Sequence, residues 1–313
     1  MRTRSLHDPD ILDFIDAVPR VVFSDASIAD IRALFASLEP EAPPLPEGVS
    51  RTDITLPGRP GEPEVRAIAL APPGMPRAHL LHIHGGGLVM GTPEHSVPKM
   101  AALCAQLGVT VLQPHYRLAP EHRAPAALMD CLAALLHLAE GADPARIIVS
   151  GDSAGGGLAF STVSAAREHL PGPIGLLHMV YPMCDPATGG PEGHQNATAG
   201  EFIWTGAHNQ YGWNAYLSGG DREAAHVPAD VSDLSGFPPT WIGTGSVDLF
   251  IDENLALAQR LIAAGIPLDM NIYAGAPHAF NAVPEAGVTR RFQRDYRDAV
   301  ERAIARAERG DTP

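Results

Sequence analysis

The chain has 313 residues, 45% of them hydrophobic, and its 36 acidic residues outnumber its 22 basic residues to give a net charge of −14. A nucleic-acid-binding protein normally carries a basic patch, and a membrane helix needs about 18 consecutive apolar residues. We therefore expect a soluble protein with no nucleic-acid partner and no membrane span. Acidic residues within the apolar part of the N-terminus argue against a signal peptide. Three cysteines without metal-ligand spacing predict free thiols and a cytoplasmic location: Cys104, Cys131 and Cys184.

The N-terminal region is expected to hold two helices, over residues 8–18 and 27–38. In the first, Ile11, Phe14, Ile15 and Val18 recur at the spacing of one helical face. The sequence EPEAPPLPEG follows, and its prolines exclude a helix there. We expect this stretch to connect the N-terminal helices to the rest of the chain.

After the connector, short β-like runs alternate with helical stretches. The expected strands, in order, are TDITL, EVRAIAL, HLLHIH, VTVLQ, RIIVS, GLLHMVY, PTWIGT and LDMNIY. Helices are expected over 94–107, 125–139, 154–169, 251–264 and 285–309. Alternation of this kind with nearly continuous apolar strands predicts an α/β protein with a mostly parallel sheet covered on both faces. No helix separates the first two strands, so we expect them to form an antiparallel edge.

Residues 185–235 interrupt this alternation. They begin with glycine, proline and polar residues and continue through the aromatic-rich EFIWTGAHNQYGWNAYL. We predict an insertion that joins residues 1–48 to form a cap over the carboxyl edge of the sheet, with 49–184 and 236–313 as the main domain. Core packing and the lining of a substrate pocket explain the cap aromatics equally well, and their roles stay open: Phe202, Trp204, Tyr211 and Trp213.

The stretch VSGDSAGGG, residues 149–157, places four glycines around Ser153 directly after an apolar run. It fits a turn without chemistry, a nucleotide-binding loop, or a turn that presents Ser153 as a nucleophile. The glycine pattern resembles that of short-chain dehydrogenases, but here it lies at the middle of the chain. None of the six tyrosines has a lysine four residues later, and the sole lysine, Lys99, precedes the motif. The phosphate-binding Gly-Lys-Ser/Thr pattern is also missing, which disfavours nucleotide binding.

The nucleophile interpretation requires further parts, because a serine hydroxyl needs a base and the base needs an orienting acid. In G-x-S-x-G the serine occupies a strained turn between a strand and a helix, as RIIVS and GGLAFSTVSAARE provide here. On sheets of this type the acid and the histidine follow later strands, in that order. Asp248 and Asp252 follow PTWIGTG, and His278 follows LDMNIY.

The motif HIHGGG, residues 82–87, ends an earlier strand and suggests an oxyanion hole. Consecutive glycines allow backbone N–H groups to approach a negatively charged oxygen, and the N–H of Ala154 at the helix start is a further candidate donor. The alternative is a metal site, since His82 and His84 alternate on one strand face. His115 and His122 do not offer a third ligand at convincing spacing.

Together these residues resemble the hormone-sensitive-lipase-like family of α/β-hydrolases, in its bacterial esterase branch. The similarity runs from about residue 75 to 282 and includes HGGG, YRLAPEHRAPAALMDC, GDSAGGG, DLSGFPPTWIGTGSVDLFIDEN and PHAF. It implies the α/β-hydrolase fold with a helical cap, Ser153 as nucleophile, His278 as base and acid, and Asp248 as the orienting carboxylate. Asp252 resembles a second, structural acid. The resemblance also implies the oxyanion-hole donors Gly86, Gly87 and Ala154, with His84 and Gly85 shaping the loop.

The sequence departs from the family pattern at a few positions. We expect these departures to affect substrate preference more than the ability to catalyse the reaction. Leu88 stands where an aromatic residue is frequent and is expected to reshape the pocket beside the oxyanion hole. The other departures are His115, Arg123, Ala124, Phe250 and Ala279.

The family resemblance implies a serine carboxylesterase that hydrolyses short- to medium-chain esters through an acyl-enzyme, with no metal or organic cofactor. The same machinery suits amides, lactones or acetylated drug-like molecules, because pocket shape selects the substrate. An alternative of another class is a silent small-ligand-binding protein on the same fold, which the presence of His278 disfavours. A small-molecule ester is the expected partner, and a homodimer through the last strand is common among similar proteins.

Overall fold

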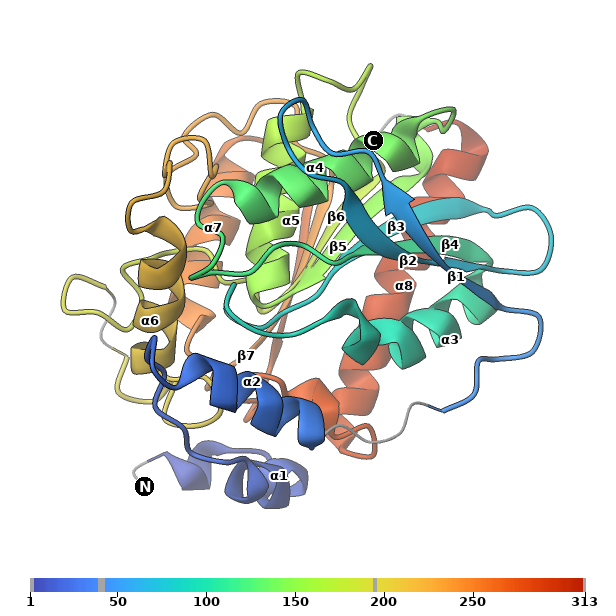
Figure 1. Cartoon of the computed structure of the whole chain (residues 1–313). Helices are drawn as coiled ribbons and strands as arrows, with labels where there is room; N and C mark the ends of the chain where they lie inside the picture. The colour runs from blue at the N-terminus through green and yellow to red at the C-terminus, as the bar shows by residue number, and fades with distance from the viewer. Residues whose placement is uncertain (1–2, 39–42, 194–195, 312–313) are drawn as a thin grey trace.

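A single mixed sheet organises the computed structural model, which describes residues 3–38, 43–193 and 196–311. Within these ranges eight strands are arranged in the order β1-β2-β4-β3-β5-β6-β7-β8 (Figure 1). The strands are β1 Ser50–Leu56, β2 Val65–Ala71, β3 Ala78–Ile83, β4 Val109–Pro114, β5 Ile147–Asp152, β6 Leu176–Val180, β7 Thr240–Gly245 and β8 Leu268–Tyr273. β2 pairs antiparallel with both β1 and β4, and all other pairs are parallel. The predicted parallel sheet with an antiparallel edge is confirmed.

The central strands β3, β5, β6 and β7 are buried along almost their whole length. Strands covered on both faces are apolar on both faces, which is why their sequences run as LLHI, IIV, LLHMV and TWI instead of alternating. The last strand β8 lies at the edge of the sheet and is only partly buried. It accordingly alternates apolar and polar residues in LDMNIY.

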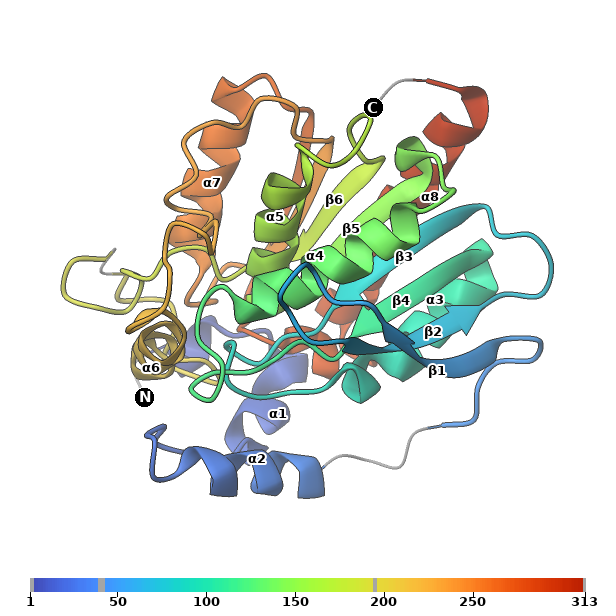
Figure 2. The ribbon, with the colours of Figure 1, turned by 45° about the horizontal axis from the view of Figure 1, so that its top comes forward.

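Helices cover both faces of this sheet (Figure 2). One face packs against α4, α5 and α7, and the other packs against α3 and α8. The helices of the main domain are α3 Val97–Leu107, α4 Ala126–Ala139, α5 Ala154–Ala166, α7 Ile251–Ala263 and α8 Gly287–Arg309. α5 ends three residues before its expected end, ahead of Pro171. A proline disfavours helical backbone at the residue before it, so the helix stops early.

The N-terminal helices α1 Leu12–Ala17 and α2 Ile28–Ser37 lie with α6 Gly206–Leu217 beyond the same end of the sheet in both views (Figures 1 and 2). Phe23, between α1 and α2, packs on the rings of Trp204, His208 and Tyr211, with centroids 5.6, 4.7 and 5.8 Å away. These contacts support our proposal that residues 1–48 and 185–235 act as one cap. Residues 1–2, 39–42 and 194–195 of the proposed cap lie outside the described residues.

Candidate active site

Ser153 occupies the turn between β5 and α5 with φ 58° and ψ −120°, a backbone conformation that costs an L-residue energy. The neighbouring glycines make this turn possible. A Cβ at Gly151 would lie 2.0 Å from the carbonyl oxygen of Gly155, and one at Gly155 would lie 2.1 Å from that of Ile83. A larger residue at Gly151 would push β5 away from the start of α5, and one at Gly155 would push α5 away from the end of β3. The glycines therefore let a buried turn hold the serine at its apex.

His278 and Asp248 meet Ser153 at this turn, although they lie about 100 residues or more further along the chain. The His278 Nε2 atom is 2.9 Å from Ser153 Oγ, and its Nδ1 atom is 2.9 Å from Asp248 Oδ2. Both bonds form together when the serine hydroxyl donates to Nε2 and the Nδ1–H donates to the carboxylate. All three side chains are buried. The sequence left Asp248 and Asp252 as alternatives from spacing alone, and Asp248 is the carboxylate in contact with His278.

The short connections after β7 and β8 bring these two residues to the serine. Asp248 lies between β7 and α7, where its Oδ1 atom accepts a hydrogen bond from the N–H of Phe250 at 2.9 Å. The Phe250 ring packs edge-on against the His278 ring, with centroids 5.1 Å apart. Phe250, a departure from the family pattern, thus forms one wall around the histidine. These contacts leave the imidazole little freedom to rotate away from Ser153.

The loop Gly85–Gly87 follows β3 and passes beside Ser153. Gly86 and Gly87 have φ of 120° and 61°, and a Cβ at Gly87 would lie 2.2 Å from the Trp204 ring. Ala154 begins α5 immediately after the serine. Among the described residues, no backbone carbonyl accepts a hydrogen bond from the N–H of Gly86, Gly87 or Ala154. This is consistent with the prediction that these three N–H groups serve as oxyanion-hole donors.

Tyr116 and His84 hold the glycine loop in place. The Tyr116 hydroxyl donates to the carbonyl oxygen of His84 at 3.0 Å, and the two rings stack with centroids 4.2 Å apart. The Nδ1–H of His84 donates to the carbonyl of Gly85 at 2.7 Å. Burial lowers the pKa of His84 to about 3, so the ring is neutral. The neutral His84 ring therefore supports the glycine loop through its contacts with Gly85 and Tyr116.

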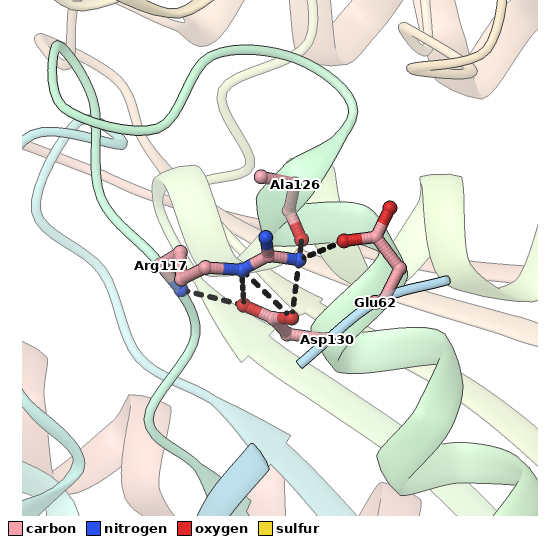
Figure 3. Close-up of polar contacts among 4 residues, drawn as sticks. All are labelled: Glu62, Arg117, Ala126 and Asp130. Atoms are coloured by element: carbon pink, nitrogen blue, oxygen red, sulfur yellow. Dashed lines mark hydrogen bonds and ion pairs between the residues drawn. The ribbon is translucent and has the colours of Figure 1, made fainter. Parts of the chain in front are cut away.

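Arg117, the next residue along, anchors the segment that carries Tyr116 (Figure 3). Its guanidinium contacts both carboxylate oxygens of Asp130, at 2.8 and 2.9 Å, and Oε2 of Glu62 at 2.7 Å. Its N–H donates to Asp130 at 2.8 Å, and the guanidinium also reaches the carbonyl of Ala126. The sequence pattern assigned no role to Arg117. The available signal was an arginine just before the helix predicted over 125–139 and an aspartate within its first two turns.

A cavity of about 230 Å³ opens beside Ser153 and His278. The proposed cap supplies much of its wall, through Phe23, Trp204 and His208. Of the cap aromatics that the sequence left open, Trp204 thus lines the cavity, and its ring centroid is 6.2 Å from that of His278. Phe23 was not anticipated as a lining residue, because the connection between the two N-terminal helices carried no recognisable pattern.

A second, much smaller cavity lies on the other side of the turn. It has a volume of about 10 Å³, room for one water-sized group. Trp213 lines it together with Leu88, Ala154, Leu158 and six further residues. Leu88, where the family favours an aromatic residue, has a φ of 69°.

Ala279, another departure from the family pattern, lines the cavity beside Ser153, whereas the cap aromatics Phe202 and Tyr211 do not. Phe202 packs edge-on against His7, and the Tyr211 hydroxyl donates to Asp25 at 3.1 Å. His115 approaches Glu94, with Nε2 and Oε1 3.5 Å apart.

The alternative of a metal site receives no support from the arrangement of potential ligands. Among the described residues no group of three or more His, Cys, Asp and Glu side chains is placed to hold a metal ion. The three cysteines are buried free thiols. No helix in the described ranges combines the length and apolar character that a membrane crossing requires.

Comparisons with known proteins agree with this geometry. The profile of the alpha/beta hydrolase fold family matches residues 80–282. An acetyl-hydrolase of Streptomyces hygroscopicus is 36% identical over 192 residues, which cover 60% of this chain and 63% of that protein. The solved structure of a bacterial heroin esterase is similar with a TM-score of 0.87 and 31% identity, over 96% of this chain and 99% of the other.

A hormone-sensitive lipase from a metagenome library is also similar, with a TM-score of 0.78 and 28% identity over 95% of this chain and 99% of that one. Both structural matches extend over the proposed cap as well as the sheet, because they cover almost all of both chains. The chain belongs to the alpha/beta hydrolase family, in the hormone-sensitive-lipase-like branch of carboxylic ester hydrolases.

Proposed function

We propose that this protein is a serine carboxylesterase whose catalytic residues are Ser153, His278 and Asp248. The observation that carries the proposal is the continuous hydrogen-bond chain from Ser153 Oγ through His278 to Asp248, with both bonds at 2.9 Å. A neutral imidazole held in this way accepts a proton from the serine, and the ionised carboxylate stabilises the imidazolium that forms. A non-catalytic ligand-binding protein would not need these two hydrogen bonds between the serine, the histidine and the aspartate.

In the proposed reaction, His278 removes the Ser153 proton while Oγ attacks the ester carbonyl. The oxygen of the tetrahedral intermediate becomes negative and accepts hydrogen bonds from the N–H groups of Gly86, Gly87 and Ala154. Such donors each lower a barrier of this kind by about 3 kcal/mol. Collapse breaks the bond to the alcohol oxygen, which takes the proton from His278 and leaves an acyl-Ser153. Water, deprotonated by the same histidine, then attacks the acyl group. Collapse of this second intermediate breaks the bond to Ser153 Oγ, which takes the proton back from His278, and the acid is released.

The two cavities support separate binding places for the alcohol group and the acyl group of the ester. The leaving alcohol must receive its proton from His278, which lines the cavity of about 230 Å³. The alcohol group therefore belongs in that cavity, against Phe23 and Trp204. The acyl group then points past Ala154 toward the cavity of about 10 Å³. This space favours the short end of the range of short- to medium-chain esters, and the names of the acetyl-hydrolase and heroin esterase relatives agree with it.

The test measures hydrolysis of p-nitrophenyl esters from acetate to decanoate by the wild type and by Ser153→Ala. We expect the variant to lose activity by a factor on the order of 10⁴ to 10⁶, and the kcat/KM of the wild type to be highest for acetate and to fall as the acyl chain lengthens. Ser164→Ala is the matched control, because the Ser164 hydroxyl also contacts a histidine, His226, at 3.0 Å but away from the site. Equal activity of Ser153→Ala and the wild type would reject the proposal, as would a wild type that an organophosphate does not label.

A further inference from the structure

A carboxylate lies immediately before the proposed nucleophile. Asp152 is the last residue of β5 and lines the same cavity as Ser153 and His278. Negative charge at this position opposes an anionic intermediate, because like charges repel most strongly where water is scarce. The proposed mechanism uses no charge at Asp152. A carboxylate this close to the reacting atoms is therefore expected to be paired with a cation.

Lys99, in the first turn of α3, provides that partner. Its Nζ atom lies 3.0 Å from Oδ2 and 3.3 Å from Oδ1 of Asp152. The ammonium also lies over the ring of Tyr296 in α8, 4.6 Å from the centroid, which fixes its position from the other side. Lys99 is the only lysine in the sequence, and the other 21 of the 22 basic residues are arginines. Its ammonium is compact enough to fit between a carboxylate and an aromatic face.

The other titratable groups around Asp152 do not supply a positive charge. His82 of β3 and His178 of β6 face it from neighbouring strands, and burial lowers the pKa values of these histidines to about 4 and about 3. Both rings are therefore neutral near pH 7. Tyr296 is neutral as well, because burial raises its pKa. Among these groups, Lys99 alone can balance the Asp152 carboxylate.

Tyr181 connects this ion pair to the proposed base. Its ring packs on that of His278 with centroids 4.6 Å apart. Tyr181, Asp152 and His278 line the same cavity beside Ser153. Burial raises the pKa of Tyr181, and the carboxylates of Asp152 and Asp248 raise it further. The hydroxyl and titratable groups that contact His278 are Ser153, Asp248 and Tyr181, and His208 packs against the Trp204 ring, which in turn faces His278.

We propose that Lys99 is a positioning residue for the ester hydrolysis: by pairing with Asp152 it cancels a carboxylate charge beside Ser153 and fixes the strand end of the turn. The inference rests on the proposed function. Without Lys99, the Asp152 charge destabilises the oxyanion and favours protonated His278, which cannot act as a base. Without the carboxylate, the unpaired ammonium has the opposite effect on the histidine.

The experiment measures kcat/KM for p-nitrophenyl acetate against pH, with thermal unfolding of each variant. We expect Lys99→Met to lower kcat/KM at pH 7 by roughly 10-fold and to move the acid limb of the profile upward by about 0.5 to 1 pH unit. Asp152→Asn moves the limb downward, and the double variant returns it close to the wild-type position. Lys99→Arg recovers most of the activity lost in Lys99→Met, because it restores the charge. Arg302→Met, which breaks the exposed pair of Arg302 with Asp269 at 2.8 Å, is the matched control.

A purely structural role for the pair predicts lower melting temperatures with an unmoved acid limb, and that result overturns the proposal. So do limbs that move in the same direction in both single variants. If Lys99→Met fails to fold, Asp152→Asn alone tests the proposal. This variant keeps the shape of the side chain, and the proposal requires it to move the acid limb of the kcat/KM profile to lower pH. A wild type without hydrolysis refutes the proposed function and this inference with it, whereas normal hydrolysis with an unmoved limb refutes only the inference.

Discussion

At the scale of single residues, backbone strain is concentrated around the site. Six non-glycine residues in the described ranges have positive φ, and five of them line the two cavities: Leu88, Ser153, Tyr181, Ile203 and Ala279. Each such conformation costs on the order of 1 kcal/mol or more and persists only where the surrounding packing enforces it. The rigid packing of the turn and the glycine loop therefore fixes the positions of the proposed catalytic groups.

The residue scale yields a prediction for the oxyanion loop. Gly87→Ala adds a Cβ at a φ of 61°, 2.2 Å from the Trp204 ring, so the loop must shift and its N–H leaves the oxyanion. We expect kcat/KM to fall by about 10² to 10³, measured with p-nitrophenyl acetate. Gly74→Ala is the control, because it has a φ of 86° and no atom near the added Cβ. Full activity of Gly87→Ala would contradict the placement of this donor.

The spacing of single residues in the sequence predicted which side chains meet but not how they are held. G-x-S-x-G, the late acid and the late histidine follow strands whose carboxyl ends share one edge, so their proximity follows from topology. The positive φ of Leu88 and the approach of Phe23 to Trp204 do not, because both depend on segments from the cap pressing on the main domain.

At the scale of elements, the segment between β4 and α4 supports the glycine loop through side chains and backbone. Besides Tyr116, the N–H of Ala119 donates to the carbonyl of Leu88 at 3.0 Å. Arg32 of α2 joins the cap to the same place, with hydrogen bonds to the carbonyls of Val89 and Ala119 at 2.7 and 2.8 Å. The loop beside Ser153 is thus held by two elements at once.

The element scale yields a prediction for Arg117. Asp130 is 2% exposed, and its carboxylate loses its cationic partner in Arg117→Met. We expect the free energy of unfolding in urea to fall by about 3 kcal/mol, because an unpaired buried charge is costly. The control is Arg222→Met, which breaks an exposed pair with Asp230 and should cost less than about 1 kcal/mol. Equal losses in the two variants would show that burial of Asp130 does not matter.

Hydrophobic patterning predicted these elements well, since the eight strands and the main helices lie where the sequence placed them. It did not predict the contacts of the segment between β4 and α4. Arg117 and Asp130 are 13 residues apart, and Glu62 is 55 residues from Arg117. Only the pairing of β2 with β4 brings the region of Glu62 to α4.

At the scale of the whole molecule, the sheet buries three histidines whose neutral forms are favoured. Burial lowers the pKa of His82 to about 4, and the pKa values of His84 and His178 to about 3, from an ordinary value of 6.5. The unfolded chain therefore takes up protons below pH 6.5 that the folded protein does not accept. By linkage, this favours unfolding as the pH falls from 6.5 toward 3.

We expect urea unfolding to give a free energy that decreases from pH 6.5 to 4. His82→Leu should make this decrease shallower, by up to about 1.4 kcal/mol per pH unit, the contribution of one proton. His82 suits this test because neither ring nitrogen has a hydrogen-bond partner among the described residues, so leucine removes no bond. His137→Leu, on the exposed side of α4, should leave the pH dependence as it is. An unchanged slope in His82→Leu would contradict the prediction.

The sequence by itself determined the family, the order of strands and helices, and the identity of the three residues that meet at the turn. These depend on local propensity and on glycines that short-range geometry requires, and both can be recognised from residues close together in the sequence. Tertiary structure alone decided which side chains of the proposed cap line the cavity, and that Lys99 pairs with Asp152 across 53 residues. Such contacts form between elements packed against each other, and their distances are set by the whole fold and not by any single segment.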